Sequence, residues 1–122
     1  MPIVDIELVR ESEAEFTGVS ATPLADALGA VLGTPPGRAW VRLRYLSSRQ
    51  YAENDSTLAG AELPALVTVL HAHALDAETL VGEARVVTQV VARGLPRAPR
   101  RVRVQYAPPG AGRLAFGAEW VL

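Results

Sequence analysis

The chain has 122 residues, a formal net charge of −1 and no cysteine, and all of its twelve Lys-plus-Arg residues are arginine. That length suits one domain over residues 1–122, and a net charge near zero gives the chain no general attraction to nucleic acid or to a membrane surface. Without cysteine or lysine it cannot form disulfides, thiolate metal sites or a lysine Schiff base, so the only amine it can offer is its N-terminus.

The segment PIVDIELV over residues 2–9 predicts a half-buried strand, because apolar and polar residues alternate along it. This N-terminal segment lacks the basic-then-apolar layout of a signal peptide. No apolar run elsewhere approaches the roughly 18 residues that a membrane span needs. We therefore expect a cytoplasmic protein with no membrane partner, in which the polar residues 10–20 form a loop after the first strand.

Residues 22–32 are predicted to form the first helix, with Thr22 as its N-cap and Pro23 in its first turn. The apolar residues of this helix recur three and four positions apart and share one face: Leu24, Ala27, Leu28, Val31 and Leu32. Gly33 and the prolines after it end the helix. Alternation over 39–46 then predicts a second strand, which places Trp40, Arg42 and Arg44 on one face and Val41, Leu43 and Tyr45 on the other.

The second half of the chain begins with a polar connection over residues 47–63, which has room for a short hairpin. The segment ALVTVLHA over 65–72 is more apolar and predicts a central strand. Asp76 is the expected cap of a second helix that ends near Arg93. The inward residues of this helix are expected to be Leu80, Ala84, Val87 and Val91.

Alternation in RVRVQY over 101–106 predicts a further strand, and a turn rich in proline and glycine separates it from a short terminal strand over 114–122. The two halves, about 2–63 and 65–122, align at an offset of 63 residues without a gap. The matched pairs include Leu32 with Leu95, Pro36 with Pro99 and Val41 with Val104. Two β-α-β units with right-handed crossovers predict an α+β fold: one four-stranded mixed sheet with both helices on one face. The other face then needs a cover, which neighbouring subunits would supply.

The proline that follows Met1, at the start of a β-α-β unit, resembles the tautomerase superfamily. That family includes 4-oxalocrotonate tautomerase, whose subunit is one such unit. It also includes macrophage migration inhibitory factor and cis-3-chloroacrylic acid dehalogenase, whose subunits are two fused units, and this chain has the fused length. Three segments are similar to the family's helix-turn-strand, arginine-bearing strand and late hairpin: LGTPPGRAWVRL (32–43), RVRVQY (101–106) and RLAFGAEW (113–120). The resemblance implies a tautomerase-like fold, a homotrimer and an enzyme that uses neither a cofactor nor a metal.

Pro2 is the catalytic residue that the resemblance implies, acting as a general base. Once Met1 is removed, its nitrogen is a secondary amine, and a free α-amino group has a pKa of about 8. Burial or a nearby arginine favours the neutral form, which suits a base that moves a proton between carbon and oxygen. The alternative is a proline that only starts an edge strand. The duplication of the β-α-β unit favours the catalytic role.

Arg103 is implied as the residue that binds a substrate carboxylate through two hydrogen bonds and polarises the developing enolate. The alternative is a solvated arginine on a strand face. Gln105, two residues later on the same face, is positioned to donate to the same substrate. Thr34 stands where macrophage migration inhibitory factor has a lysine, which favours the carboxylate substrates of the arginine-bearing branch of the family.

Tyr51 aligns with an aromatic residue that lines the pocket of 4-oxalocrotonate tautomerase, so it either lines a pocket or packs under its loop. His71 and His73 are two residues apart at the end of the third strand and are expected to point the same way. No third ligand stands out, so no metal site is predicted. His73 falls near the place where relatives contact substrate, so it either lines a pocket or lies on the surface. Arg42 and Arg44 are expected at an interface or on the surface.

These residues predict a cofactor-free tautomerase, an isomerase that moves a proton in a small enol or unsaturated 2-oxo acid. One alternative on the same scaffold is water addition of the hydratase or dehalogenase type, in which a protonated Pro2 is the acid. That reaction needs a carboxylate to activate water, for which Glu119 is the nearest candidate. The other alternative is a non-catalytic trimeric interaction protein that retains Met1.

Overall fold

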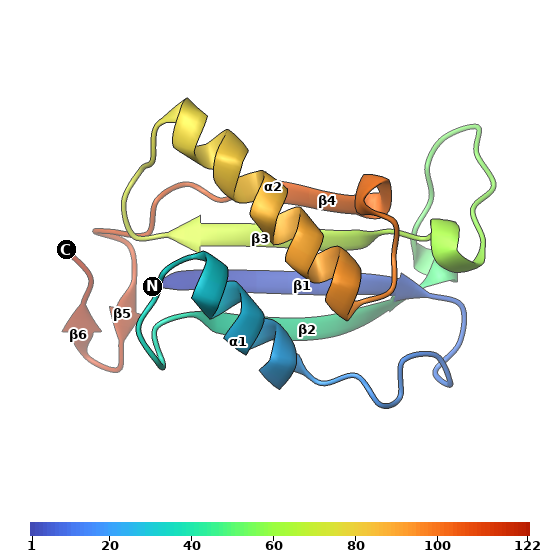
Figure 1. The fold of residues 1–122 in the computed structure, drawn as a ribbon, viewed down its shortest axis with the longest axis horizontal. Helices are drawn as coiled ribbons and strands as arrows, with labels where there is room; N and C mark the ends of the chain where they lie inside the picture. The colour runs from blue at the N-terminus through green and yellow to red at the C-terminus, as the bar shows by residue number, and fades with distance from the viewer.

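The sheet contains strands from both halves of the chain (Figure 1). The computed structural model describes residues 1–122 and orders the four strands β2-β1-β3-β4, namely β2 (Trp40–Ser47), β1 (Pro2–Arg10), β3 (Ala65–His71) and β4 (Val102–Tyr106). Within each half the two strands run parallel, and the antiparallel pair β1 and β3 joins the halves at the centre. The predicted four-stranded mixed sheet, with a central third strand, is confirmed.

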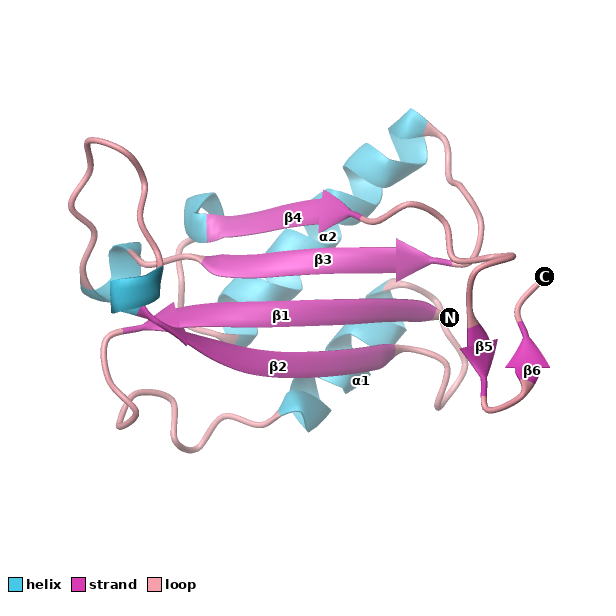
Figure 2. Ribbon diagram, turned by 180° about the vertical axis from the view of Figure 1, so that it is seen from behind, coloured by secondary structure: helices cyan, strands magenta, loops and turns pink.

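The two helices, α1 (Ala21–Val31) and α2 (Ala77–Gly94), cover one face of this sheet, as predicted (Figures 1 and 2). Asp76 caps α2 as expected, because its carboxylate accepts a hydrogen bond from the Thr79 backbone N–H at 2.7 Å. The predicted cap of α1 is wrong: Ser20, not Thr22, is the N-cap. Pro23 therefore lies within the first turn of the helix. Backbone N–H groups in that turn have no acceptor within the helix, so the missing N–H of proline costs no hydrogen bond. Neither helix is long and apolar enough to cross a membrane.

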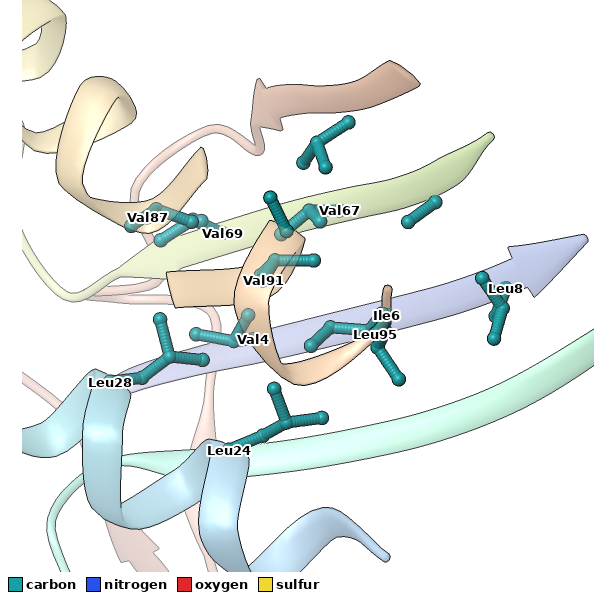
Figure 3. Packing of buried hydrophobic residues seen from close by; sticks show 13 residues of the cluster. Val4, Ile6, Leu8, Leu24, Leu28, Val67, Val69, Val87, Val91 and Leu95 are labelled. Atoms are coloured by element: carbon teal, nitrogen blue, oxygen red, sulfur yellow. The ribbon is translucent and has the colours of Figure 1, made fainter. Parts of the chain in front are cut away.

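The core lies between the sheet and the helices (Figure 3). Alternate residues of the two central strands point into it, and one stripe of each helix meets them: Val4, Ile6 and Leu8; Val67 and Val69; Leu24 and Leu28; Val87 and Val91. All nine are at most 3% exposed. Burying each such side chain contributes about 1.5–3 kcal/mol. Because apolar residues recur every two positions in the strands and every three to four in the helices, burial turns one face of each element toward the core.

The opposite face of the sheet carries no helix, and we call it the open face (Figure 2). Its residues are the alternate set of each strand: Ile3, Asp5 and Glu7; Trp40, Arg42 and Arg44; Leu66, Thr68 and Leu70; Arg103 and Gln105. Arg42 forms an ion pair with Asp5 of its own chain, with Nη2 to Oδ2 at 2.8 Å. Trp40 is still 43% exposed. The open face therefore mixes apolar and charged residues that the single chain leaves uncovered.

Two segments of the chain differ from the prediction. Residues 47–63 contain no hairpin but two 3₁₀ turns, η1 (Ser48–Gln50) and η2 (Gly60–Glu62), because the polar stretch between them has no alternating apolar residues to bury. In place of the single terminal strand predicted over 114–122, β5 (Ala115–Phe116) and β6 (Glu119–Trp120) pair as a short hairpin, which agrees with the resemblance of residues 113–120 to the family's late hairpin. Gly117 turns this hairpin with a φ of +62°, a conformation that glycine adopts without strain.

Candidate active site

Pro2 begins β1 with its ring fully buried, beside His71 of β3 in the antiparallel register. In this structure the Pro2 nitrogen is an amide joined to Met1. Because a proline has no N–H, it can start the strand without leaving a donor unpaired. The position therefore fits both the catalytic and the structural prediction for Pro2, and the removal of Met1 decides between an amine and an amide.

The C-terminal hairpin lies at the Pro2 end of the sheet, where the chain begins (Figure 1). Trp40, the register partner of Ile3, anchors it: the ring centroids of Trp40 and Phe116 are 4.4 Å apart in an edge-to-face arrangement. The indole N–H of Trp40 donates to the Gly37 carbonyl at 2.9 Å. The hairpin and the loop before it thus frame the surroundings of Pro2.

A half-buried polar cluster lies on the helix side of the sheet next to Pro2. The Glu83 carboxylate of α2 accepts a hydrogen bond from the Tyr106 hydroxyl at 2.7 Å, and the same oxygen lies 2.7 Å from His71 Nε2. The His71 and Glu83 side chains are only 17% and 13% exposed. Sequence reasoning missed Glu83 and Tyr106. Glu83 lies three residues after Leu80 and four before Val87 of the predicted inward face. This helical spacing could have predicted that Glu83 faces the sheet.

Burial, and then the hydrogen bond to Glu83, raise the pKa of Tyr106 above its ordinary value of 10. Above pH 10 an unfolded chain releases this proton while the folded chain keeps it, so the free energy of unfolding should fall as the pH rises. We expect urea titrations between pH 8 and pH 11 to show this fall, and Tyr106→Phe to remove part of it. Identical slopes for the two proteins would contradict the assignment.

A second polar cluster surrounds Glu53 at the far end of β4. One oxygen of its carboxylate accepts hydrogen bonds from the Tyr51 hydroxyl at 2.7 Å, from Arg103 at 2.7 Å and from Arg101 at 3.4 Å. The Tyr51 hydrogen bond, followed by the charges of Arg103 and Arg101, holds the pKa of Glu53 below its usual value. Two cations against one carboxylate leave a net positive charge. Arg103 is 46% exposed and makes no hydrogen bond through Nε or Nη1, so it can still bind an anion.

Gln105 lies beside Arg103 on the open face, and its amide donates to the Thr68 hydroxyl at 3.0 Å. A groove of about 300 Å³ follows both residues between β3 and β4. His73 lies elsewhere: it is exposed in the loop after β3, on a cavity of about 110 Å³ that His71 and Tyr106 also line. The largest cavity, about 470 Å³ between α1 and α2, includes none of the predicted site residues.

Pro2 and Arg103 do not meet within one chain. In the register, Pro2 pairs with His71 and Arg103 pairs with Leu66, so their partners are five positions apart along β3. At about 3.3 Å per residue the separation is roughly 16 Å. The structure thus places His73 toward the Pro2 end and Tyr51 at the Arg103 end, with Gln105 between. No group of three or more His, Asp or Glu side chains is arranged to hold a metal ion.

The fold is similar to those of solved structures of a fused 4-OT, of Pt0534 and of a macrophage migration inhibitory factor. A fused 4-OT described as a symmetric trimer is 15% identical, with 98% of this chain and 94% of that chain covered and a TM-score of 0.76. Pt0534, inactivated by 2-oxo-3-pentynoate, is 16% identical, with 98% and 94% covered and a TM-score of 0.74. The macrophage migration inhibitory factor of Oncomelania hupensis is 16% identical, with 99% and 82% covered and a TM-score of 0.71. No family model and no curated protein sequence matches the chain. At such identities the likeness is one of fold.

Proposed function

We propose that this chain is a cofactor-free tautomerase that moves a proton in a small enol or unsaturated 2-oxo acid. The observation that carries the proposal is the buried Pro2 at the start of β1 in a tautomerase fold. After Met1 is removed, the Pro2 nitrogen accepts a proton from the enol and returns it to carbon. Burial disfavours the charged amine and so keeps the base ready at neutral pH. Arg103 binds the substrate carboxylate and stabilises the negative charge that develops on the enolate.

The separation of about 16 Å between Pro2 and Arg103 in one chain exceeds the length of such a substrate. We therefore propose that Arg103 of a second subunit completes the site. The open face carries Arg103 and Gln105 and has no cover in the single chain, so a second copy packed on it can bring an arginine to the Pro2 end. We propose a homotrimer, because the fused 4-OT with the same fold is a trimer.

The test is ketonisation of 2-hydroxymuconate and phenylenolpyruvate by protein whose intact mass shows that Met1 is absent. We expect turnover, and we expect Arg103→Ala to raise KM for the carboxylate-bearing enol by about tenfold to a hundredfold, since a hydrogen bond to a charged group contributes about 1.5–3 kcal/mol. Arg44→Ala is the matched control, because Arg44 is an exposed arginine of the same face on the other edge strand.

No turnover of either compound would contradict the tautomerase proposal. An unchanged KM in Arg103→Ala would contradict the role of this arginine. Light scattering supplies an independent measurement, because a monomer would rule out the shared site.

Water addition is the second candidate, and the Glu53 cluster favours it. Hydration needs a carboxylate beside the substrate, and Glu53 contacts Arg103, whereas Glu119 lies on the exposed C-terminal hairpin. In that reaction a protonated Pro2 supplies the proton and Glu53 accepts one from water. Hydration of an unsaturated acid without ketonisation of the enols would select this function. A protein that retains Met1 and does neither would be a non-catalytic trimer.

A further inference from the structure

Met1 lies against Gly110 on the open-face side of Pro2. A Cβ placed on Gly110 would lie 3.3 Å from the Met1 Cε atom, 3.6 Å from Leu114 Cδ2 and 3.6 Å from Leu70 Cδ1. Gly110 is buried, and Met1, Leu70 and Leu114 are half-buried. The end of the Met1 side chain therefore fills an apolar slot whose floor is the bare backbone of Gly110.

The backbone holds this slot in place independently of Met1. The Gly110 N–H donates to the His71 carbonyl at 2.9 Å, and the Ala107 N–H donates to the Val69 carbonyl at 2.9 Å. The loop is thus tied to β3 at two points, and His71 is the register partner of Pro2. Removal of Met1 breaks neither of these hydrogen bonds, so we expect the apolar walls of the slot to remain in place next to the Pro2 amine.

We propose that the slot left by Met1, formed by Leu70, Gly110 and Leu114, binds the apolar chain of the substrate and sets substrate specificity. The inference rests on the proposed function. Met1 occupies the place of the substrate, so the unprocessed protein is blocked twice: its nitrogen is an amide and its slot is full. The favoured substrate is a 2-oxo acid or its enol with an unbranched apolar chain about as long as a methionine side chain.

The test compares 2-oxobutanoate with 2-oxohexanoate, which share the carboxylate and carbonyl and differ only in the length of the apolar chain. Exchange of the C3 protons in D2O, followed by NMR, measures the enolisation of both. Since each buried methylene contributes about 0.8 kcal/mol, we expect kcat/KM of Met1-free protein to favour 2-oxohexanoate by about tenfold. Gly110→Ala should remove this preference, because its methyl group fills the slot at ordinary contact distance from Leu70 and Leu114.

Gly82→Ala is the matched control, since a methyl group there meets no atom within 4 Å. Equal preference in the wild type and in Gly110→Ala, or no preference in the wild type, would overturn the inference. If neither the wild type nor the variants exchange either acid, the proposed function fails. Calorimetric titration of the two acids then tests the slot by binding alone. Tighter binding of 2-oxohexanoate than of 2-oxobutanoate that is lost in Gly110→Ala and in Met1-retaining protein would support the slot, and equal binding of the two acids would overturn it.

Discussion

Replacing Pro2 with alanine is expected to lower kcat/KM for ketonisation by about a hundredfold, the scale of a positioned general base. An alanine N-terminus is still an amine, and alanine and proline are both small second residues that permit the removal of Met1. The loss therefore arises from position and solvation: the ring holds the Pro2 nitrogen at the start of β1 in a buried place, whereas the primary amine of alanine rotates freely and is better hydrated. The measurement compares initial rates of the two proteins after their masses show equal removal of Met1.

Pro64→Ala is the matched control for Pro2→Ala. Pro64 is also buried, and it precedes β3 as Pro2 begins β1. Its carbonyl accepts a hydrogen bond from the Val9 N–H at 3.0 Å, which alanine preserves. We expect activity close to that of the wild type. Equal kcat/KM in Pro2→Ala and the wild type would mean that Pro2 is not the base, whatever the remaining activity.

The fold was predictable because each of its elements has a local signal. The alternation in 2–9 has the period of a strand, and the spacing of three and four residues after residue 22 has the period of a helix. Both patterns recur in the second half at an offset of 63 residues. The boundaries and caps were less accurate: the N-cap of α1 is Ser20, two residues before the predicted Thr22, and its side chain makes no capping hydrogen bond. The hairpin allowed in 47–63 is absent, because a polar segment without alternation does not distinguish a hairpin from short turns.

The site was predictable only in part, because its contacts join residues that are distant in the sequence. The resemblance singled out Tyr51 and Arg103, but not Glu53, which joins them. The sequence also did not show that Pro2 and Arg103 lie at opposite ends of β3, because that follows from the antiparallel register of β1 and β3. The register depends on how strands that are distant in the sequence pair with each other, so it follows from the folded sheet and not from the pattern of either strand alone.

Arg97 is a buried arginine that no sequence pattern indicated. It is only 7% exposed, and it donates to the Leu63 carbonyl at 2.7 Å and to the Val9 carbonyl at 3.1 Å. Burial lowers the pKa of its guanidinium, and the Phe16 ring covers it at 5.0 Å. The side chain therefore joins the end of β1 to the segment before β3, where the two halves of the chain meet.

Arg97→Met is expected to lower the free energy of unfolding by about 3 kcal/mol, because it keeps an aliphatic side chain but leaves the two carbonyls without a donor, each at about 1–3 kcal/mol. Guanidinium titrations should show a lower midpoint with an unchanged slope, since the surface exposed on unfolding is the same. Arg100→Met, three residues later and exposed, should stay within about 0.5 kcal/mol of the wild type. Equal stabilities for the two variants would mean that water replaces the guanidinium at these carbonyls, and that the core between sheet and helices alone holds the two halves together.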